Sequence, residues 1–303
     1  MKTITLDKTA LKVSEVCLGG DVFGSKLDRD TTFRVLDRFR EGGGSFIDTA
    51  NVYSRDWANG YSVSERLLGE YLNSRGKDSL IIATKGAHPN PRTMHTPRIN
   101  KTELERDIDE SLRSLGLERI DFYYLHRDDP SMPIGEILEL MEDFVRAGKI
   151  RYYGGSNYSA GRIREAGEYA RERGIAGFSG ISNMWSPAEQ NAAAPLCGDD
   201  TLVCFTDNDL PVVGGCGIAF LPYNSTAKGW FAKRAAGAVS AGLDATFANS
   251  QNLALLEKLK SDAAEGGISV QTALLRHIRS RQEQIVPITS VSRIEQLDDI
   301  LMV

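Results

Sequence analysis

The sequence has few of the features that mark disulfide-rich, metal-binding or membrane-spanning proteins. Four cysteines occur in 303 residues and none forms a C-x-x-C pair, so we expect free thiols in a reducing compartment. Four histidines give no H-x-H or H-E-x-x-H spacing, and we therefore predict no metal site. No run approaches the roughly 20 apolar residues of a membrane span, and no apolar signal segment follows Met1. We expect a cytoplasmic protein.

The sequence also lacks an excess of basic residues. Lysine and arginine total 36 against 41 aspartate and glutamate, which gives a formal net charge of -5. This balance predicts neither nucleic acid nor an anionic membrane as a partner. Charged residues make up 25% and hydrophobic residues 41% of the chain, as is ordinary for a globular protein. Composition leaves the oligomeric state open.

Short apolar runs alternate with helix-period segments through the whole length. The strand-like runs cover residues 16–18, 46–49, 80–85, 122–126, 150–154, 178–181, 218–221 and 285–288. Helix patterns begin after Asp30 and near residues 62, 100 and 133, and also cover 159–173, 252–264 and 269–281. Eight strands in 303 residues leave about 38 residues per unit, which fits strand–helix repeats. We predict one (β/α)8 TIM-barrel domain over residues 1–303, with a short N-terminal hairpin.

Two segments fit this repeat less well. Residues 187–217 show no long helix pattern, and we expect irregular structure or a short helix there. Residues 231–249 are rich in alanine and glycine, and they read as a mobile loop over one end of the barrel.

Four polar residues lie at or just after the ends of predicted strands: Asp48, Tyr53, Lys85 and His126. The ends of parallel strands are where an α/β barrel places its chemistry. Reduction of a carbonyl by hydride requires a proton donor, and a tyrosine with a pKa of about 10 is a poor one unless a nearby cation lowers that pKa. Lys85 would supply the cation, Asp48 would pair with Lys85, and His126 would orient the carbonyl oxygen. The hydride would come from a cofactor.

Each of these residues also has an ordinary structural interpretation. Alone, Asp48 would be a cap or a core ion pair, Tyr53 a surface aromatic, Lys85 a solvated strand end and His126 a hydrogen-bonded core histidine. Their common position favours a site. Of the remaining residues with possible roles, Trp57 either lines a substrate pocket or packs in its loop, and His277 is expected to pack on an apolar face. Trp230 lies either near the cofactor or in the core, and the core is favoured. His88 and His95 follow Lys85 in a loop where they could contact substrate, but a solvated loop is favoured.

Several motifs occur together in one order along the chain. Phe46-Ile47-Asp48-Thr49-Ala50-Asn51-Val52-Tyr53 resembles the aldo-keto reductase signature around its catalytic aspartate and tyrosine. Ala83-Thr84-Lys85 and Tyr124-Leu125-His126 resemble the strands that carry the lysine and histidine of that family. Gly154-Gly155-Ser156-Asn157 is similar to its Gly-x-Ser-Asn motif. The resemblance runs from about residue 3 to the C-terminus.

The resemblance implies an extended NADP(H) bound across the mouth of the barrel. Gly20, Asp21, Val22 and Asp48 would lie at its nicotinamide end, Ser156, Asn157 and Ser182 at the carboxamide, and Trp185 against the nicotinamide ring. Residues Tyr223, Asn224, Ser225, Thr226, Ala227, Lys228 and Gly229 would wrap the pyrophosphate. Ser290, Ser292, Arg293 and Gln296 would hold the adenosine end. Trp57 and His126 would contact substrate.

Some positions depart from the family pattern. Ser182 replaces a glutamine, Asn224-Ser225 replaces Ser-Pro, Ile300 stands where asparagine is common, and the segment 286–293 lacks the usual Pro-Gly. Arg293 still favours NADP(H), because arginine pairs bidentately with phosphate.

The resemblance implies an oxidoreductase that transfers hydride from NADPH to an aldehyde or ketone. A catalytically slow cofactor sensor on the same barrel is the alternative. A metal-dependent hydrolase is disfavoured by the histidine spacing, and a two-carboxylate glycosidase would not need Tyr53, Lys85 or Ser156-Asn157. The sequence does not identify the carbonyl substrate.

Overall fold

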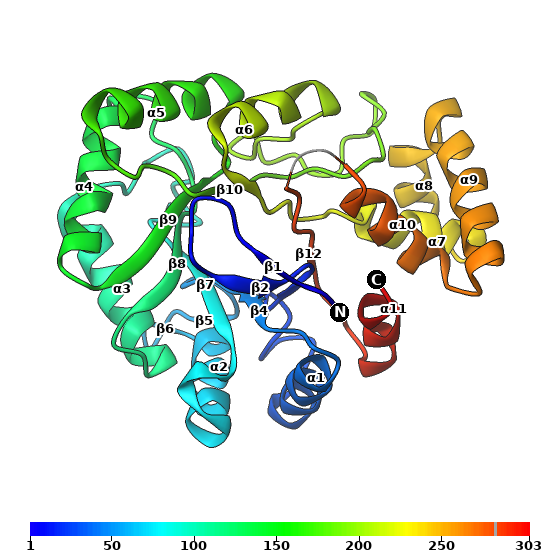
Figure 1. The fold of residues 1–303 in the computed structure, drawn as a ribbon, viewed down its shortest axis with the longest axis horizontal. Coiled ribbons are helices and arrows are strands. Elements are labelled where there is room, and N and C mark those ends of the chain that lie inside the picture. The colour runs from blue at the N-terminus through cyan, green and yellow to red at the C-terminus, as the bar shows by residue number, and fades with distance from the viewer. Residues whose placement is uncertain (282–283) are drawn as a thin grey trace.

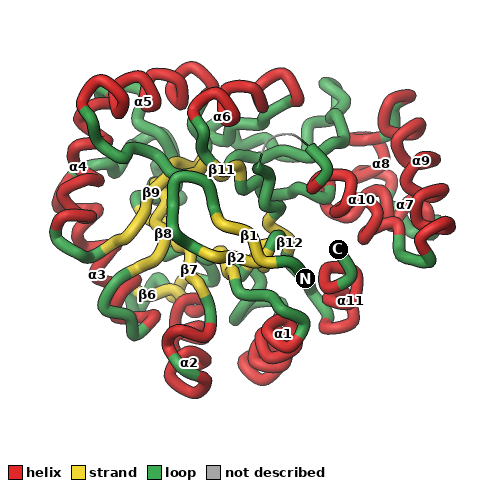
Figure 2. Tube along the Cα trace, viewed as in Figure 1, coloured by secondary structure: helices red, strands yellow, loops and turns green. Residues whose placement is uncertain are grey.

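Parallel strands surround the centre of the molecule, and helices surround the strands (Figure 1, Figure 2). The computed structural model describes residues 1–281 and 284–303. The strands of the main sheet are β3 (Cys17–Gly19), β4 (Phe46–Asp48), β7 (Ile81–Gly86), β8 (Ile120–Leu125), β9 (Ile150–Ser156), β10 (Gly180–Ser182), β11 (Ala219–Phe220) and β12 (Ile288–Thr289). Each overlaps one of the eight runs expected from the sequence.

The sheet closes on itself. Neighbouring strands follow the order β11, β10, β9, β8, β7, β4, β3, β12, and all of these pairs are parallel. A parallel bridge from Phe220 to Ile285 joins the two ends of this order. The Phe220 amide donates to the Gln284 carbonyl at 2.9 Å, and the Val286 amide donates to the Phe220 carbonyl at 2.8 Å. The predicted (β/α)8 barrel is confirmed.

The helices lie outside this sheet. They are α1 (Arg29–Glu41), α2 (Val63–Arg75), α3 (Lys101–Leu115), α4 (Ile134–Arg146), α5 (Ala160–Arg173), α6 (Leu210–Cys216), α7 (Trp230–Ala235), α8 (Ala241–Phe247), α9 (Ser250–Gly266), α10 (Val270–Arg279) and α11 (Leu297–Leu301). Short 3-10 turns cover Lys77–Ser79, Asp207–Asp209, Ala227–Gly229 and Ile294–Gln296. None of the helices in the described ranges is long and apolar enough to cross a membrane.

Local capping explains where the principal helices begin and end. The side chains of Ser62 and Asn100 accept hydrogen bonds from the backbone three residues later, so they cap α2 and α3. Gly116 ends α3 in the left-handed conformation that glycine adopts easily. The expectation that the first helix begins after Asp30 was wrong: the Asp28 side chain caps α1 by accepting from the Thr31 amide, and Asp30 lies inside the first turn.

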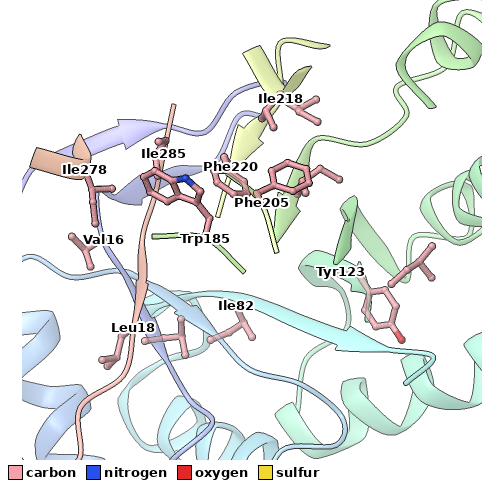
Figure 3. Close-up of a cluster of buried hydrophobic side chains, with 14 of the residues drawn as sticks. Val16, Leu18, Ile82, Tyr123, Trp185, Phe205, Ile218, Phe220, Ile278 and Ile285 are labelled. Carbon is pink, nitrogen blue, oxygen red and sulfur yellow. The ribbon is translucent and has the colours of Figure 1, made fainter. Parts of the chain in front are cut away.

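Side-chain alternation along the strands creates two apolar cores. One core fills the barrel and contains Cys17, Phe46, Ala83, Phe122 and Tyr124. The other lies between strands and helices and contains the cluster drawn in Figure 3. An N-terminal hairpin of β1 (Thr3–Thr5) and β2 (Lys12–Ser14) crosses one mouth of the barrel (Figure 1) and contributes apolar side chains to the barrel core. The opposite mouth, at the carboxyl ends of the strands, remains for the site.

The two weaker segments turn out differently. Within 187–217 the structure contains the short helix α6, as expected. Within 231–249 the expectation of a loop was wrong, because α7 and α8 occupy most of the segment. The Trp230 indole is fully buried and donates to Asp244 of α8 at 3.0 Å, and Ser240 caps α8. The hydrogen bond between Trp230 and Asp244 and the Ser240 cap therefore stabilise helices in a stretch whose sequence has only weak helical periodicity.

Candidate active site

Four polar side chains meet at the carboxyl-end mouth of the barrel. Asp48 is the last residue of β4, Lys85 lies next to the end of β7, and His126 directly follows β8. Tyr53 follows β4 in a turn that its amide closes by donating to the Ala50 carbonyl at 3.0 Å. Strand register explains the convergence, since Asp48 pairs with Ala83 of β7 and Lys85 pairs with Tyr124 of β8.

Lys85 connects three of the surrounding groups. Its ammonium forms an ion pair with Asp48, donates to the Tyr53 hydroxyl at 3.1 Å and donates to the Thr49 carbonyl at 3.0 Å. The Lys85 and Asp48 side chains are only 3% and 4% exposed. Charges this deeply buried require partners, and each of the three donors of the ammonium has one.

Burial sets the protonation states of these groups. Burial raises the pKa of Tyr53, and the nearby Lys85 ammonium opposes that rise without cancelling it. The expectation that Lys85 brings the pKa of Tyr53 below its ordinary value is therefore not met in the free site. Burial lowers the pKa of Lys85, but Asp48 and Tyr53 outweigh this and the net shift is upward. Tyr53 is consequently a protonated phenol, and Lys85 a cation, at neutral pH.

His126 is an uncharged imidazole. Burial, with smaller contributions from His88, Lys85 and Arg127, holds the pKa of His126 well below its ordinary value. Its ring lies edge-on to Tyr53, with 5.9 Å between ring centroids. Its buried Nδ1 has no hydrogen-bond partner within residues 1–281 and 284–303. A neutral imidazole with a proton on Nε2 is a hydrogen-bond donor for an incoming oxygen.

A cleft extends from Tyr53 across the barrel mouth. It has a volume of about 710 Å³, within the range of small-molecule and cofactor sites. Twelve of the residues expected at the site line it: Asp21, Val22, Asp48, Tyr53, Tyr223, Asn224, Thr226, Lys228, Gly229, Ser290, Ser292 and Gln296. The cleft thus joins the predicted nicotinamide end to the predicted adenosine end.

The cleft is also lined by five polar residues that the sequence did not single out: Lys26, Lys233, Gln271, Thr289 and Asp299. Lys233 stands one helical turn after Gly229, and its ammonium donates to the Lys228 carbonyl at 2.8 Å. Residues four positions apart lie on the same face of a helix, so the sequence could have placed Lys233 next to Gly229 and hence at the cleft. No local pattern pointed to Lys26 or Gln271.

Ser156 and Asn157 lie at the floor of the mouth in a closed network. The Ser156 hydroxyl donates to the Ser182 carbonyl at 2.6 Å. The Asn157 amide donates to the His126 carbonyl at 3.1 Å and accepts from the Tyr223 hydroxyl at 2.6 Å. The Ser182 hydroxyl is buried without a partner in the described part of the chain. Asn157 thus contacts His126 directly, whereas Ser156, Asn157 and Ser182 do not line the cleft.

Other expected site residues lie away from the open cleft. Trp185 is 1% exposed and packs among core residues (Figure 3), with its ring 5.9 Å from that of Phe220, so this conformation offers no face to a nicotinamide. Ser225 and Ala227 are buried, and Arg293 is exposed beside Ser292. Gly20 is buried, and its amide donates to the Asp48 carbonyl at 2.7 Å. Trp57 is 58% exposed and lines a smaller cavity together with Asn51 and His88.

The two histidines expected in the loop after Lys85, His88 and His95, differ in burial. His95 is exposed, as predicted, and lies 3.7 Å from Asp200. His88 lies in the loop after β7, as predicted, but it is partly buried instead of solvated, and its ring lies edge-on to His126 with 4.7 Å between centroids. Within the described ranges, no group of three or more His, Cys, Asp or Glu side chains is arranged to hold a metal ion.

Comparison with known proteins identifies the family. The family model described as "Aldo/keto reductase family" matches residues 15–303. The chain therefore belongs to the aldo/keto reductase family, a family of oxidoreductases.

Curated relatives carry reductase or dehydrogenase names. Norsolorinic acid reductase stcV of Emericella nidulans is 27% identical over 303 residues, covering 95% of this chain and 73% of the relative. The uncharacterized oxidoreductase YrpG of Bacillus subtilis is 30% identical, covering 63% and 60%. Aryl-alcohol dehydrogenase [NADP(+)] of Phanerodontia chrysosporium is 31% identical, covering 58% and 49%. The chain spans about half to three quarters of the length of these relatives.

Proposed function

We propose that this protein transfers hydride between a nicotinamide cofactor, NADP(H), and the carbonyl carbon of an aldehyde or ketone. The contact that carries the proposal is the 3.1 Å hydrogen bond from the Lys85 ammonium to the Tyr53 hydroxyl, backed by the Asp48 ion pair. This arrangement joins a proton donor to a fixed cation in a cleft of about 710 Å³. The oxidoreductase names of the relatives agree with it.

Tyr53 would act as the general acid in reduction. Its phenol keeps its proton at neutral pH because burial raises its pKa. As negative charge develops on the carbonyl oxygen, the phenol gives up its proton to that oxygen. The Lys85 ammonium stabilises the phenolate that remains. In the reverse direction the phenolate would accept the proton of the alcohol.

His126 would fix the position of the carbonyl oxygen. A neutral donor next to Tyr53 can hydrogen-bond that oxygen without supplying the proton itself. The Asn157 amide holds the backbone of His126 by donating to its carbonyl. The ring is thereby kept beside Tyr53 while substrate enters and leaves.

The cleft residues fit a nicotinamide dinucleotide. When bound, the cofactor supplies the hydride, for which no side chain has the chemistry. Lys26, Lys228 and Lys233 line the cleft and would face the phosphates. Ser290, Ser292 and Gln296 would hold the adenosine end, with Arg293 beside them. Four basic residues in and beside one cleft favour a ligand that carries phosphate groups, as NADP(H) does in its pyrophosphate and its 2'-phosphate.

The test is consumption of NADPH, followed at 340 nm, with a panel of aldehydes and ketones. We expect wild-type turnover, and a loss of about 10²- to 10⁴-fold in Tyr53→Phe. NADPH should still quench the protein fluorescence of Tyr53→Phe, with a Kd close to that of the wild type, because the phenol oxygen contributes little to cofactor binding.

Two results would argue against the proposal. Full activity of Tyr53→Phe would remove the tyrosine from its role as acid. Tight NADPH binding without turnover on any substrate would favour a cofactor-sensing protein instead of an enzyme.

A further inference from the structure

His88 extends the ring contacts at the barrel mouth beyond the four residues described so far. Tyr53 lies edge-on to His126 with 5.9 Å between ring centroids, and His126 lies edge-on to His88 with 4.7 Å. His88 is therefore adjacent to the imidazole that would hold the carbonyl oxygen. None of the roles assigned above uses it.

The backbone at His88 is held in an unusual conformation. Ala87, the preceding residue, has a φ of 56°, which non-glycine residues rarely adopt. Its amide donates to the Asp107 carboxylate at 2.9 Å. The His88 carbonyl accepts from Arg98 at 2.7 Å, and Arg98 pairs with Asp107 at 2.9 Å. Local strain maintained by an ion pair is typical of residues positioned for function.

The hydrogen bonds of His88 decide which ring nitrogen carries the proton. Its Nδ1 lies 2.7 Å from the Pro89 carbonyl, and a carbonyl can only accept, so Nδ1 is the donor. Burial lowers the pKa of His88 below its ordinary value, which leaves the ring neutral at pH 7. The Nε2 atom is then a hydrogen-bond acceptor, and no donor from residues 1–281 or 284–303 reaches it.

A small polar cavity adjoins His88. It has a volume of about 110 Å³ and is lined by Asn51, Val52, Arg55, Trp57 and His88, among others. Asn51 is 2% exposed. Its Oδ1 accepts from Arg55 at 2.8 Å, but its buried Nδ2 has no partner in the described part of the chain. A buried donor without a partner costs free energy, so this Nδ2 indicates a polar ligand or water.

A hydroxyl group matches both of these atoms. It can donate to an acceptor such as His88 Nε2 and accept from a donor such as Asn51 Nδ2. Because the His88 and His126 rings are adjacent, with 4.7 Å between centroids, a carbonyl compound held by His126 would bring the substituent on its neighbouring carbon toward His88. A methyl group in the same place would leave both polar atoms unpaired, which disfavours binding of the non-hydroxylated analogue.

We propose that His88 and Asn51 form a hydroxyl-binding subsite that selects α-hydroxy carbonyl compounds as substrates. The proposal rests on the reductase function proposed above. It assigns substrate contact to His88, through the Nε2 acceptor, and to Asn51, through Nδ2.

Matched substrate pairs test the subsite. Hydroxyacetone and 2-butanone differ by one hydroxyl in place of one methyl, as do α-hydroxyacetophenone and propiophenone. With NADPH as reductant, we expect wild-type kcat/KM to favour the hydroxylated member of each pair by at least about tenfold. In His88→Phe, which keeps a planar ring but removes the acceptor, this ratio should fall by about tenfold or more. His88→Gln retains an acceptor and should recover part of the ratio.

His95→Phe is the matched control, because His95 belongs to the same loop and its side chain is 76% exposed; its ratio should equal that of the wild type. The proposal is overturned if wild type converts both members equally, or if His88→Phe slows both by the same factor. Absence of NADPH consumption with every carbonyl would instead overturn the reductase function, and the subsite with it. If His88→Phe does not fold, judged by near-UV circular dichroism, the wild-type ratio and His88→Gln still decide.

Discussion

Asp48 and Glu65 are two buried carboxyl groups on opposite faces of β7. Asp48 lies at the mouth and pairs with the Lys85 ammonium. Glu65 belongs to α2, behind the strand, where it accepts from the Thr84 hydroxyl at 2.6 Å. Its second oxygen has no partner in the described ranges. Thr84 and Lys85 are consecutive, so strand alternation sends their side chains to opposite faces.

Asp48 and Glu65 differ in their hydrogen-bond and ion-pair partners, and not in how deeply they are buried. Asp48 is 3% exposed and Glu65 is fully buried. Burial raises the pKa of both, but the ammonium beside Asp48 keeps that pair charged. Glu65 has only hydroxyl donors and a more distant Arg55, and its pKa rises to about 7. Asp48 thus keeps its charge because a cation lies beside it, whereas Glu65 has no adjacent cation among residues 1–281 and 284–303. Of the two carboxyl groups, only the one in the candidate active site retains its buried charge.

Removal of the cation should have the largest effect. In Lys85→Met, Asp48 becomes a buried carboxylate without a counterion, and breaking such a pair typically costs about 3–5 kcal/mol. Turnover should fall by at least about 100-fold, because the phenolate of Tyr53 loses its stabilising charge. Urea unfolding and NADPH oxidation measure the two effects.

The double variant Asp48→Asn with Lys85→Met provides the control for this prediction. It removes both charges, so its free energy of unfolding should fall by less than the sum of the two single losses. Additive losses would mean that the two side chains do not stabilise each other. Restored turnover in the double variant would contradict the role of the cation in catalysis.

Glu65→Gln should produce the next largest effect, and with the opposite sign. The folded state holds the Glu65 proton up to about pH 7, whereas the unfolded chain releases it near the model value of 4.5. Stability should therefore fall as pH rises from about 4.5 to about 7, by roughly 3 kcal/mol in total. Glu65→Gln is neutral at every pH and should be more stable than wild type at pH 8. Denaturant unfolding between pH 4.5 and 8 measures this.

The surface variant Glu257→Gln serves as the comparison for Glu65. Glu257 lies on α9 with a side chain 69% exposed, and its replacement should change stability by less than about 0.5 kcal/mol. If wild type and Glu65→Gln have parallel stability curves between pH 4.5 and 7, Glu65 does not titrate there.

The sequence predicted the strands and the residues at their ends better than it predicted the surrounding helices. Buried parallel strands are continuous apolar runs, so the runs that end at Asp48, Lys85 and His126 were visible without tertiary information. The helices α7 and α8 were not, because their stability depends on the contact of Trp230 with Asp244, two residues 14 positions apart in a weakly periodic stretch.

Within the site, prediction failed where long-range packing decides the position of a side chain. Trp185 is an aromatic residue just after β10, and only the surrounding Phe220 and Asp207 show that it belongs to the core. His88 lies in its predicted loop, but its partial burial could not be predicted, because the hydrogen bonds from Arg98 to the His88 carbonyl and from the Ala87 amide to Asp107 join residues 10 and 20 positions apart. The sign of the pKa shift of Tyr53 likewise depends on burial, which a motif does not report.

An exposed cation completes the comparison and should give the smallest effect. Arg293 lies at the surface beside Ser292 of the cleft, and an exposed ion pair with the 2'-phosphate of NADPH is weakened by water and salt. Arg293→Ala should therefore raise the Kd for NADPH by only about three- to tenfold and change the Kd for NADH by less than twofold. Fluorescence titration with each cofactor measures both constants.

The effect of Arg293→Ala on the Kd for NADPH should shrink in 0.5 M salt, whereas the loss of turnover in Lys85→Met should not, because a buried pair is screened far less. Arg113→Ala, an exposed change on α3, should alter neither Kd. An unchanged ratio of the two constants in Arg293→Ala would assign the preference for NADPH to the lysines that line the cleft.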